Sequence, residues 1–151
     1  MTMEDADELS AKARASALAS LAMREHSTLE LRDKLLRKNM PEQVVSKLIL
    51  QLHKDNLLSD ARFAEVYWRQ RAARGFGPIK IAYELQNKGV DETTIENGQQ
   101  HAEVDFSETI KAVYIKKYGN AAYQDFTEKV KRQNFLYRRG FPVELIKDVI
   151  D

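Results

Sequence analysis

The sequence predicts an all-α protein, built as an elongated, curved array of three tandem three-helix repeats with about nine helices. Three observations support this prediction. The 151 residues include only 6 glycines and 3 prolines, and long stretches are rich in strong helix formers. Apolar residues recur at the spacing i, i+3, i+4 and not in the alternation that is typical of strands. The same order of helix-stopping and helix-starting residues occurs three times along the chain.

A helix with one buried face is clearest in the stretch that follows Pro41. Its apolar residues form a single stripe, which consists of Val44, Val45, Leu48, Ile49 and Leu52. Other helix starts are predicted where a polar residue can cap the first turn, at Ser27 with Glu30 and at Asp105 with Glu108. The prolines sit where helices should begin and several glycines where they should end; these are Pro41, Pro78, Pro142, Gly89, Gly119 and Gly140.

The repeat is visible in residues 35–45, 85–95 and 136–146, which share one order of residue types: apolar, basic, helix stop, apolar, helix start, apolar. The leading residues Leu35, Leu85 and Leu136 are 50 and 51 residues apart. An apolar triplet precedes each stretch; the three triplets are Leu18, Leu21 and Ala22, then Phe63, Val66 and Tyr67, then Ile110, Val113 and Tyr114. The near-constant distance predicts a unit of three helices that is used three times.

We therefore divide the chain into four segments. Residues 1–10 form an acidic N-terminal segment that we expect to be flexible, and residues 11–56, 57–104 and 105–151 form the three helical repeats. Helical repeats stack side by side and bury their apolar faces on their neighbours, so the array should present a long surface and no deep catalytic cleft.

Composition narrows the class further. A hydrophobic content of 43% and a charged content of 31% indicate a globular protein with a charged surface. The absence of cysteine excludes disulfides, thiol catalysis and Cys-based zinc sites, and it suits a reducing compartment. No apolar run approaches the roughly 20 residues of a membrane span, and the acidic N-terminus does not look like a signal peptide. We expect a cytoplasmic protein.

Residues that could support catalysis are scattered. The loop from Gly75 to Pro78 has two glycines of a dinucleotide fingerprint, but it lacks the third and no strand precedes it, so a tight connection is the better interpretation. His26, His53 and His101 lie in different regions, where capping or solvated roles fit better than metal binding. The sequence therefore predicts no enzyme activity, no cofactor and no metal.

Basic residues provide the positive signal for a binding function. Lys and Arg late in a helix also complement the helix dipole, so a purely structural role stays open. We expect the residues that bind a partner to be Arg62, Arg69, Arg71, Arg74 and Lys80, with Lys131, Arg132, Arg138 and Arg139 as a second group. A third basic set consists of Lys34, Arg37 and Lys38.

Trp68 is the single tryptophan, and it adjoins the apolar triplet of the second unit. Three roles fit this position: a core residue, a contact between repeats, or an anchor for a binding partner.

The middle of the chain resembles the RecX family, regulators of the recombinase RecA. The matching motifs are Leu58–Ser59–Asp60–Ala61–Arg62–Phe63–Ala64, then Arg71 and Arg74, then Gly77–Pro78, Ile81, Glu84–Leu85 and Lys88–Gly89–Val90. The first unit fits as well, through Leu18, Arg24, Ser27, Glu30–Leu31, Leu35 and Lys38. The third unit carries only general similarity.

The resemblance implies tandem three-helix repeats and a regulatory function. RecX-like proteins lie along the helical groove of the RecA–DNA filament, hinder filament growth or strand exchange, and lower its ATP hydrolysis without being ATPases. The resemblance thus implies RecA as the partner, with DNA contacted directly or through the filament. An alternative is a general DNA-binding helical repeat without a dedicated protein partner, although the net charge of +1 argues against it.

Overall fold

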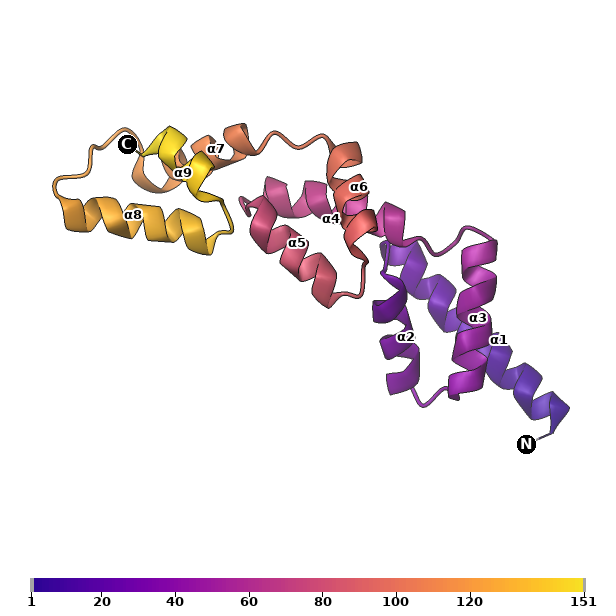
Figure 1. Cartoon of the computed structure of the whole chain (residues 1–151). Coiled ribbons are helices and arrows are strands. Elements are labelled where there is room, and N and C mark those ends of the chain that lie inside the picture. Colours follow the sequence, from indigo (N-terminus) through magenta and orange to yellow (C-terminus); the bar gives the residue numbers. More distant parts are fainter. Residues whose placement is uncertain (1, 151) are drawn as a thin grey trace.

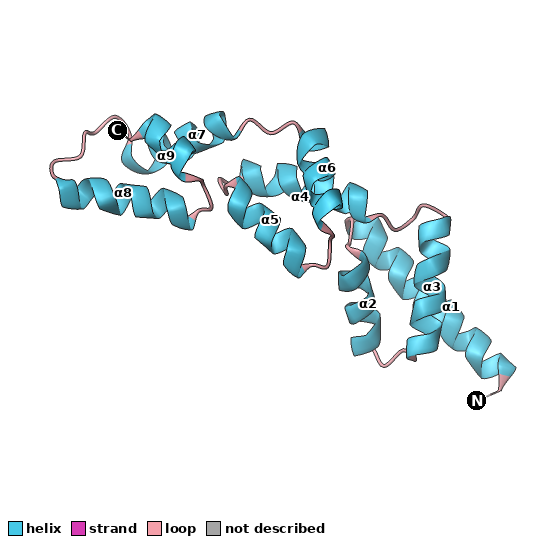
Figure 2. Cartoon of the chain, in the orientation of Figure 1, coloured by secondary structure: helices cyan, strands magenta, loops and turns pink. Residues whose placement is uncertain are grey.

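The computed structural model describes residues 2–150, and this part of the chain contains nine helices and no strand (Figures 1 and 2). The helices follow one another in three groups along an extended, bent molecule. The first group is α1 (Met3–Met23), α2 (Thr28–Arg37) and α3 (Glu42–Lys54). The second is α4 (Asp60–Ala73), α5 (Pro78–Asn87) and α6 (Glu92–Ala102), and the third is α7 (Phe106–Tyr118), α8 (Phe126–Arg138) and α9 (Val143–Val149). The predicted all-α array of three-helix repeats is confirmed.

Side chains cap the helices where the sequence predicts. The Ser27 hydroxyl accepts a hydrogen bond from the Glu30 backbone N–H at 3.1 Å, and the Glu30 carboxylate accepts one from the Ser27 N–H at 3.1 Å. Asp105 caps α7 by accepting from the backbone of Ser107 at 3.0 Å. Each cap satisfies N–H groups that have no partner inside the helix.

The three stops that follow the second helices share one backbone geometry. Asn39, Gly89 and Gly140 all have positive φ, at 64°, 79° and 98°. This left-handed conformation ends a helix without strain for glycine and at low cost for asparagine. The equivalence of Asn39 with the two glycines supports the repeat that the sequence predicts.

The first helix differs from expectation in two respects. It begins at Met3, inside the acidic segment that we expected to be flexible, because Thr2 caps it and the acidic residues of its first turn complement the helix dipole. Its buried face is Ala13, Ala17 and Ser20, whereas Leu18 is 37% exposed. Of the predicted apolar triplet, only Leu21 packs against the core, and α1 packs mainly on its small residues.

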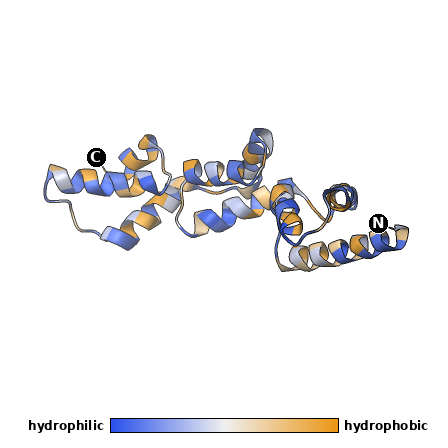
Figure 3. Cartoon of the chain, turned by 90° about the horizontal axis from the view of Figure 1, so that it is seen from below, coloured by the Kyte–Doolittle hydropathy of each residue, from blue (hydrophilic) through white to orange (hydrophobic). Residues whose placement is uncertain are grey.

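Buried apolar residues form two separate clusters. One belongs to the first repeat and extends to Leu58, just before α4. The other runs through the second and third repeats together, from Phe63 to Ile150. In Figure 3, hydrophobic and hydrophilic residues alternate along the helices, as expected when each helix buries one face. The second and third repeats thus share one core, and the first has its own.

The backbone joins the second and third repeats directly. The Gly77 N–H donates to the carbonyl of Arg139 at 2.8 Å, and the Ile79 N–H donates to the carbonyl of Gly140 at 3.0 Å. A Cβ atom on Gly77 would lie 2.5 Å from the carbonyl carbon of Gly140, closer than atoms can approach. The absence of a side chain at residue 77 lets the two loops meet.

Within residues 2–150, no helix has the length and apolar character that crossing a membrane requires.

A basic strip along the three repeats

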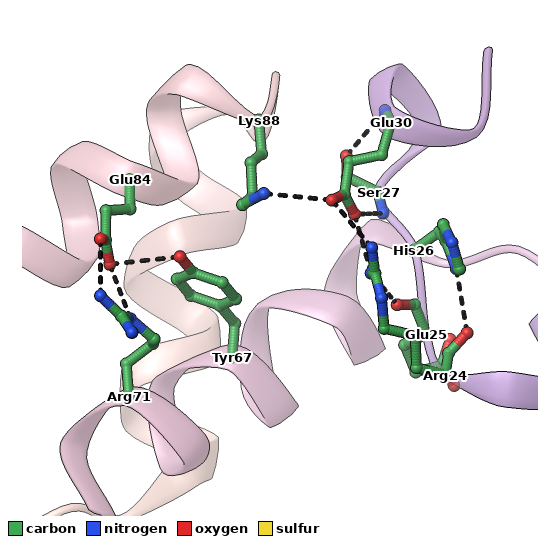
Figure 4. Close-up of polar contacts among 9 residues, drawn as sticks. All are labelled: Arg24, Glu25, His26, Ser27, Glu30, Tyr67, Arg71, Glu84 and Lys88. Atoms are coloured by element: carbon green, nitrogen blue, oxygen red, sulfur yellow. Dashed lines mark hydrogen bonds and ion pairs between the residues drawn. The ribbon is translucent and has the colours of Figure 1, made fainter. Parts of the chain in front are cut away.

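Polar contacts connect the first repeat to the second (Figure 4). The Glu30 carboxylate accepts hydrogen bonds from Arg24, at 3.2 and 3.3 Å, and from Lys88 of the second repeat, at 3.1 Å. Burial by itself would raise the pKa of Glu30. The hydrogen bonds from Arg24, from the Ser27 N–H and from Lys88 outweigh burial and lower the pKa to about 2. Glu30 is therefore held as a carboxylate between two cations.

Two further contacts cross the same junction. Arg62 donates from Nε to Glu25 at 2.9 Å, and it also reaches the side-chain oxygen of Asn56 at 3.0 Å. The Thr28 N–H donates to the Asp60 carboxylate at 2.7 Å. Arg62, a predicted partner-binding residue, thus has an internal role at the junction.

The low pKa of Glu30 predicts a pH-dependent stability. The carboxylate stabilises the fold fully above its ordinary pKa of 4.5, and this contribution is lost as pH falls towards about 2. At neutral pH we expect Glu30→Gln to cost about 2 kcal/mol of unfolding free energy, after allowance for solvent screening of the half-exposed Arg24. Urea denaturation at a series of pH values should show the gap between the variant and the parent closing between pH 4.5 and about 2.

Glu96→Gln is the matched control, because Glu96 is exposed and makes no ion pair among the described residues. A gap that stays constant with pH would contradict the assigned role of Glu30.

The histidines make backbone contacts. A ring nitrogen of each lies within hydrogen-bonding distance of a carbonyl oxygen: His26 with Arg24 at 3.0 Å, His53 with Leu58 at 3.1 Å, and His101 with Asn97 at 2.8 Å. These contacts stabilise turns and helix ends.

Arg71 is oriented by a carboxylate and an aromatic ring. It donates to both oxygens of Glu84, at 3.0 and 2.8 Å, and its guanidinium carbon lies 3.9 Å from the centre of the Phe76 ring. The Tyr67 hydroxyl also donates to Glu84, at 3.2 Å, and burial followed by the nearby Glu84 charge raises the pKa of Tyr67 to about 12. Arg71 is half-buried and fixed, so a charge reversal there would change the fold as well as the surface.

Phe76 gathers three cations from two repeats. Besides Arg71, the Lys80 nitrogen lies 5.1 Å from the ring centre and the Arg139 guanidinium carbon lies 4.8 Å from it. Cations are attracted to the negative faces of an aromatic ring. The loop sequence around Phe76 therefore brings Arg71, Lys80 and Arg139, all predicted site residues, to one place at the junction of the second and third repeats.

Arg132 is buried inside the third repeat. Its exposed fraction is 3%, and its guanidinium donates to the Tyr114 hydroxyl, the Ala121 carbonyl and Glu128, at 2.8, 2.7 and 2.8 Å. The same group lies 4.5 Å from the centre of the Tyr118 ring. We expected Arg132 to contact a partner. Its contacts with α7 and the following loop instead make it a structural residue of the third repeat.

The remaining predicted residues are exposed, and they differ in their neighbours. Arg69 pairs with Glu65 one turn earlier on α4. Arg74, Lys131 and Arg138 make no ion pair with any described residue. These three charges are available to an outside ligand.

A groove of about 650 Å³ lies where α4, α7 and α8 meet. Its floor is apolar and consists of Ala72, Ala73, Ala112, Val113 and Phe135. Charged residues rim it: Arg74, Lys116, Lys117, Arg139 and Glu108. We call it the α4–α7–α8 groove.

Lys116 and Lys117 were not among the residues that the sequence singled out. They lie in the last turn of α7, where basic residues are expected for the dipole alone. They share the groove with Arg74, which lies more than forty residues earlier in the sequence, and with Arg139, which follows α8. Only the packing of the second repeat on the third makes them part of a cluster.

Successive hollows connect the basic residues along the molecule. Lys34, Arg37 and Lys88 line a hollow at the first junction, together with the acidic Glu30 and Asp33. Lys88 shares the next hollow with Arg71, Glu25 and Glu30. Phe76 links Arg71 to Arg139 in the α4–α7–α8 groove, and Lys117 continues into a hollow with Lys131 and Arg138. We call this set the basic strip: Lys34, Arg37, Lys88, Arg71, Lys80, Arg139, Arg74, Lys116, Lys117, Lys131 and Arg138.

Comparison with known proteins agrees with this architecture. Family models for the first, second and third three-helix domains of RecX match residues 13–52, 59–98 and 103–150. The chain belongs to the RecX family. The chain is similar to Regulatory protein RecX of Halorhodospira halophila, with 37% identity over 145 residues, covering 96% of this chain and 90% of that protein. Regulatory protein RecX of Salmonella typhimurium is 34% identical over 143 residues, covering 88% and 86%.

Solved RecX structures share the fold. A crystal structure of regulatory protein RecX superimposes with a TM-score of 0.76 at 22% identity, covering 95% of this chain and 74% of the other. RecX from Lactobacillus salivarius gives a TM-score of 0.75 at 24% identity, covering 95% and 96%. The chain is thus a RecX-family regulatory protein, and its relatives are named as regulators and not as enzymes.

Proposed function

We propose that this RecX-family chain regulates the RecA recombinase by docking along the groove of the RecA–DNA filament, where it hinders filament extension and lowers ATP hydrolysis. Membership of a family of regulatory proteins supports the regulatory role. The basic strip, which runs through all three repeats, is the observation that supports binding to an extended polymer. With this function we also propose that the protein is cytoplasmic.

The length of the strip matters for the proposed mechanism. Contacts made by successive repeats act on one ligand, so each further contact forms at a high effective concentration and modest affinities multiply. A bound array that bridges neighbouring protomers opposes their rearrangement during ATP turnover. Charge–charge contacts also predict an affinity that falls with salt.

The deciding experiment measures the DNA-dependent ATPase and the strand exchange of RecA while the protein is added at substoichiometric to stoichiometric ratios. We expect both activities to fall. Unchanged activities at a stoichiometric ratio would remove the proposal.

Mobility shifts on single- and double-stranded DNA without RecA separate this function from general DNA binding. Weak, salt-sensitive shifts agree with a filament-specific regulator. Tight binding to bare DNA at physiological salt would favour the alternative, in which the strip contacts phosphates alone.

Charge reversal tests the strip itself. We expect Arg74→Glu combined with Arg138→Glu to weaken filament binding at least about tenfold, equivalent to about 1.4 kcal/mol, because both side chains are exposed and free of internal ion pairs. Fluorescence anisotropy with labelled RecA–DNA filaments gives the affinity. Lys47→Glu combined with Lys54→Glu changes the net charge equally on the exposed side of α3 and should bind like the parent. Equal losses in both double variants would show a nonspecific charge effect.

A further inference from the structure

The α4–α7–α8 groove combines an apolar floor with a cationic rim, which distinguishes it from the rest of the basic strip. Ala72, Ala112, Val113 and Phe135 form the floor. We infer that this groove binds a short acidic–apolar peptide segment of a protein partner, with an apolar side chain on the floor and carboxylates at the rim. The inference rests on the proposed function only in that the filament protein supplies this segment.

The floor favours an apolar side chain. The volume of about 650 Å³ lies within the range of pockets that hold ligands. The alanines of the floor, on α4 and α7, have short side chains that leave space above them, and Gly75 lines one end of the groove. A Cβ atom at Gly75 would lie 2.9 Å from Val113, so any larger residue would encroach on this end. Apolar contact here removes floor area from water.

The rim favours carboxylates. Arg74, Lys116, Lys117 and Arg139 stand against a single acidic residue, Glu108. The Nε atom of Arg139 is also buried and has no hydrogen-bond acceptor among the described residues. That atom is closed to solvent, so an incoming carboxylate would meet the exposed charged groups of Arg74, Lys116 and Lys117.

Single-stranded nucleic acid fits this groove less well. Proteins that bind single strands without sequence preference do so partly by stacking the bases on aromatic side chains. Phe135 already has the Lys117 nitrogen 4.6 Å from its ring centre and the Arg139 guanidinium 5.5 Å from it. The nearby Phe76 ring is occupied by three cations. A strand would therefore find charge but no stacking surface, while an apolar side chain needs only the alanine floor.

Fluorescence anisotropy of the full-length protein tests this inference. The probe is a labelled short peptide in which Asp and Glu alternate with Leu and Phe. Two matched peptides replace either the acidic residues with Lys or the apolar residues with Ser, and labelled oligo-dT serves as the nucleic-acid probe. We expect salt-sensitive binding of the acidic–apolar peptide, and at least about tenfold weaker binding of both matched peptides.

Two variants locate the peptide. Ala112→Trp fills the floor at an exposed residue, and Lys117→Glu reverses the rim; each should weaken peptide binding at least about tenfold. Ala15→Trp, at an exposed residue of α1 far from the groove, should bind like the parent. Circular dichroism checks that each variant is folded.

The inference is overturned if the Ser peptide binds as tightly as the apolar one, or if neither variant weakens peptide binding. It is also overturned if oligo-dT binds more tightly than the peptide and Ala112→Trp weakens the binding of oligo-dT. These outcomes are independent of the recombinase assays. Peptide binding without RecA inhibition would reject the proposed function but support the peptide site in the groove. RecA inhibition without peptide binding would support the proposed function but reject the peptide site.

Discussion

Replacing Trp68 with alanine is expected to lower the free energy of unfolding by about 3–5 kcal/mol, because a fully buried indole leaves a large cavity. Trp68 on α4 donates from its ring nitrogen to the Ile95 carbonyl on α6 at 3.0 Å. Its ring meets the edge of Phe106, the first residue of α7, with 5.9 Å between centres. The substitution therefore weakens both the second repeat and its contact with the third. Urea denaturation followed by circular dichroism measures the loss.

Trp68→Phe is the matched control for this prediction. Phenylalanine keeps most of the packing against Phe106 but leaves the Ile95 carbonyl without its donor, so we expect a smaller loss of about 1–3 kcal/mol. A loss below about 1 kcal/mol for Trp68→Ala would contradict a core role. Filament binding should change only as far as the folded fraction changes, because the buried side chain is not available to a partner.

Replacing Gly77 with alanine is expected to cost about 3 kcal/mol and to separate the third repeat from the second. The new Cβ would lie 2.5 Å from both the carbonyl carbon and oxygen of Gly140, which are backbone atoms and cannot move aside without breaking the hydrogen bonds between the two loops. The φ angle of Gly77 is −89°, so backbone strain at residue 77 does not contribute. Thermal unfolding gives the cost, and hydrogen exchange of α7 to α9 reports the separation.

Gly119→Ala is the control that measures backbone strain at a positive φ without any steric contact of the new Cβ atom. Its φ is +61°, but a Cβ atom there would have no neighbour within 4 Å. We expect a loss of about 1–2 kcal/mol from backbone strain alone, without faster exchange in the loop between α4 and α5. If Gly77→Ala were no more costly than Gly119→Ala, the close approach of the two loops would not be a determinant of stability.

The fold could be predicted because its signals are local. The cap of Ser27 with Glu30, the helix start at Pro78 and the helix stop at Gly140 depend on residues close in sequence, and the recurrence of such signals predicts the repeat. The role of Trp68 needed the structure, which shows a core residue that also touches the next repeat. The packing face of α1 was missed because it is made of small residues, which carry little hydrophobic signal.

The proposed binding surface was less predictable from the sequence, because it depends on the packing of segments that are distant along the chain. Arg132 looked like its basic neighbours in the sequence, yet Tyr114, 18 residues earlier, and the Ala121 carbonyl turn it inwards. Conversely, Lys117 becomes part of a basic cluster only because Arg74, from another repeat, lines the same groove. Charge alone in a sequence cannot distinguish a buried guanidinium from an exposed one.

The two junctions between repeats differ in the contacts that join them, so we expect them to differ in stiffness. Close-packed apolar contacts, which join the second and third repeats, lose about a quarter to a half of their attraction when a gap of about 0.5–1 Å opens. The attraction between charges such as Lys88 and Glu30 declines more gradually with distance. We therefore expect a bending load to open the array first between α3 and α4, with the six C-terminal helices moving together. A regulator jointed in this way can keep its first bundle engaged while a helical polymer changes its pitch.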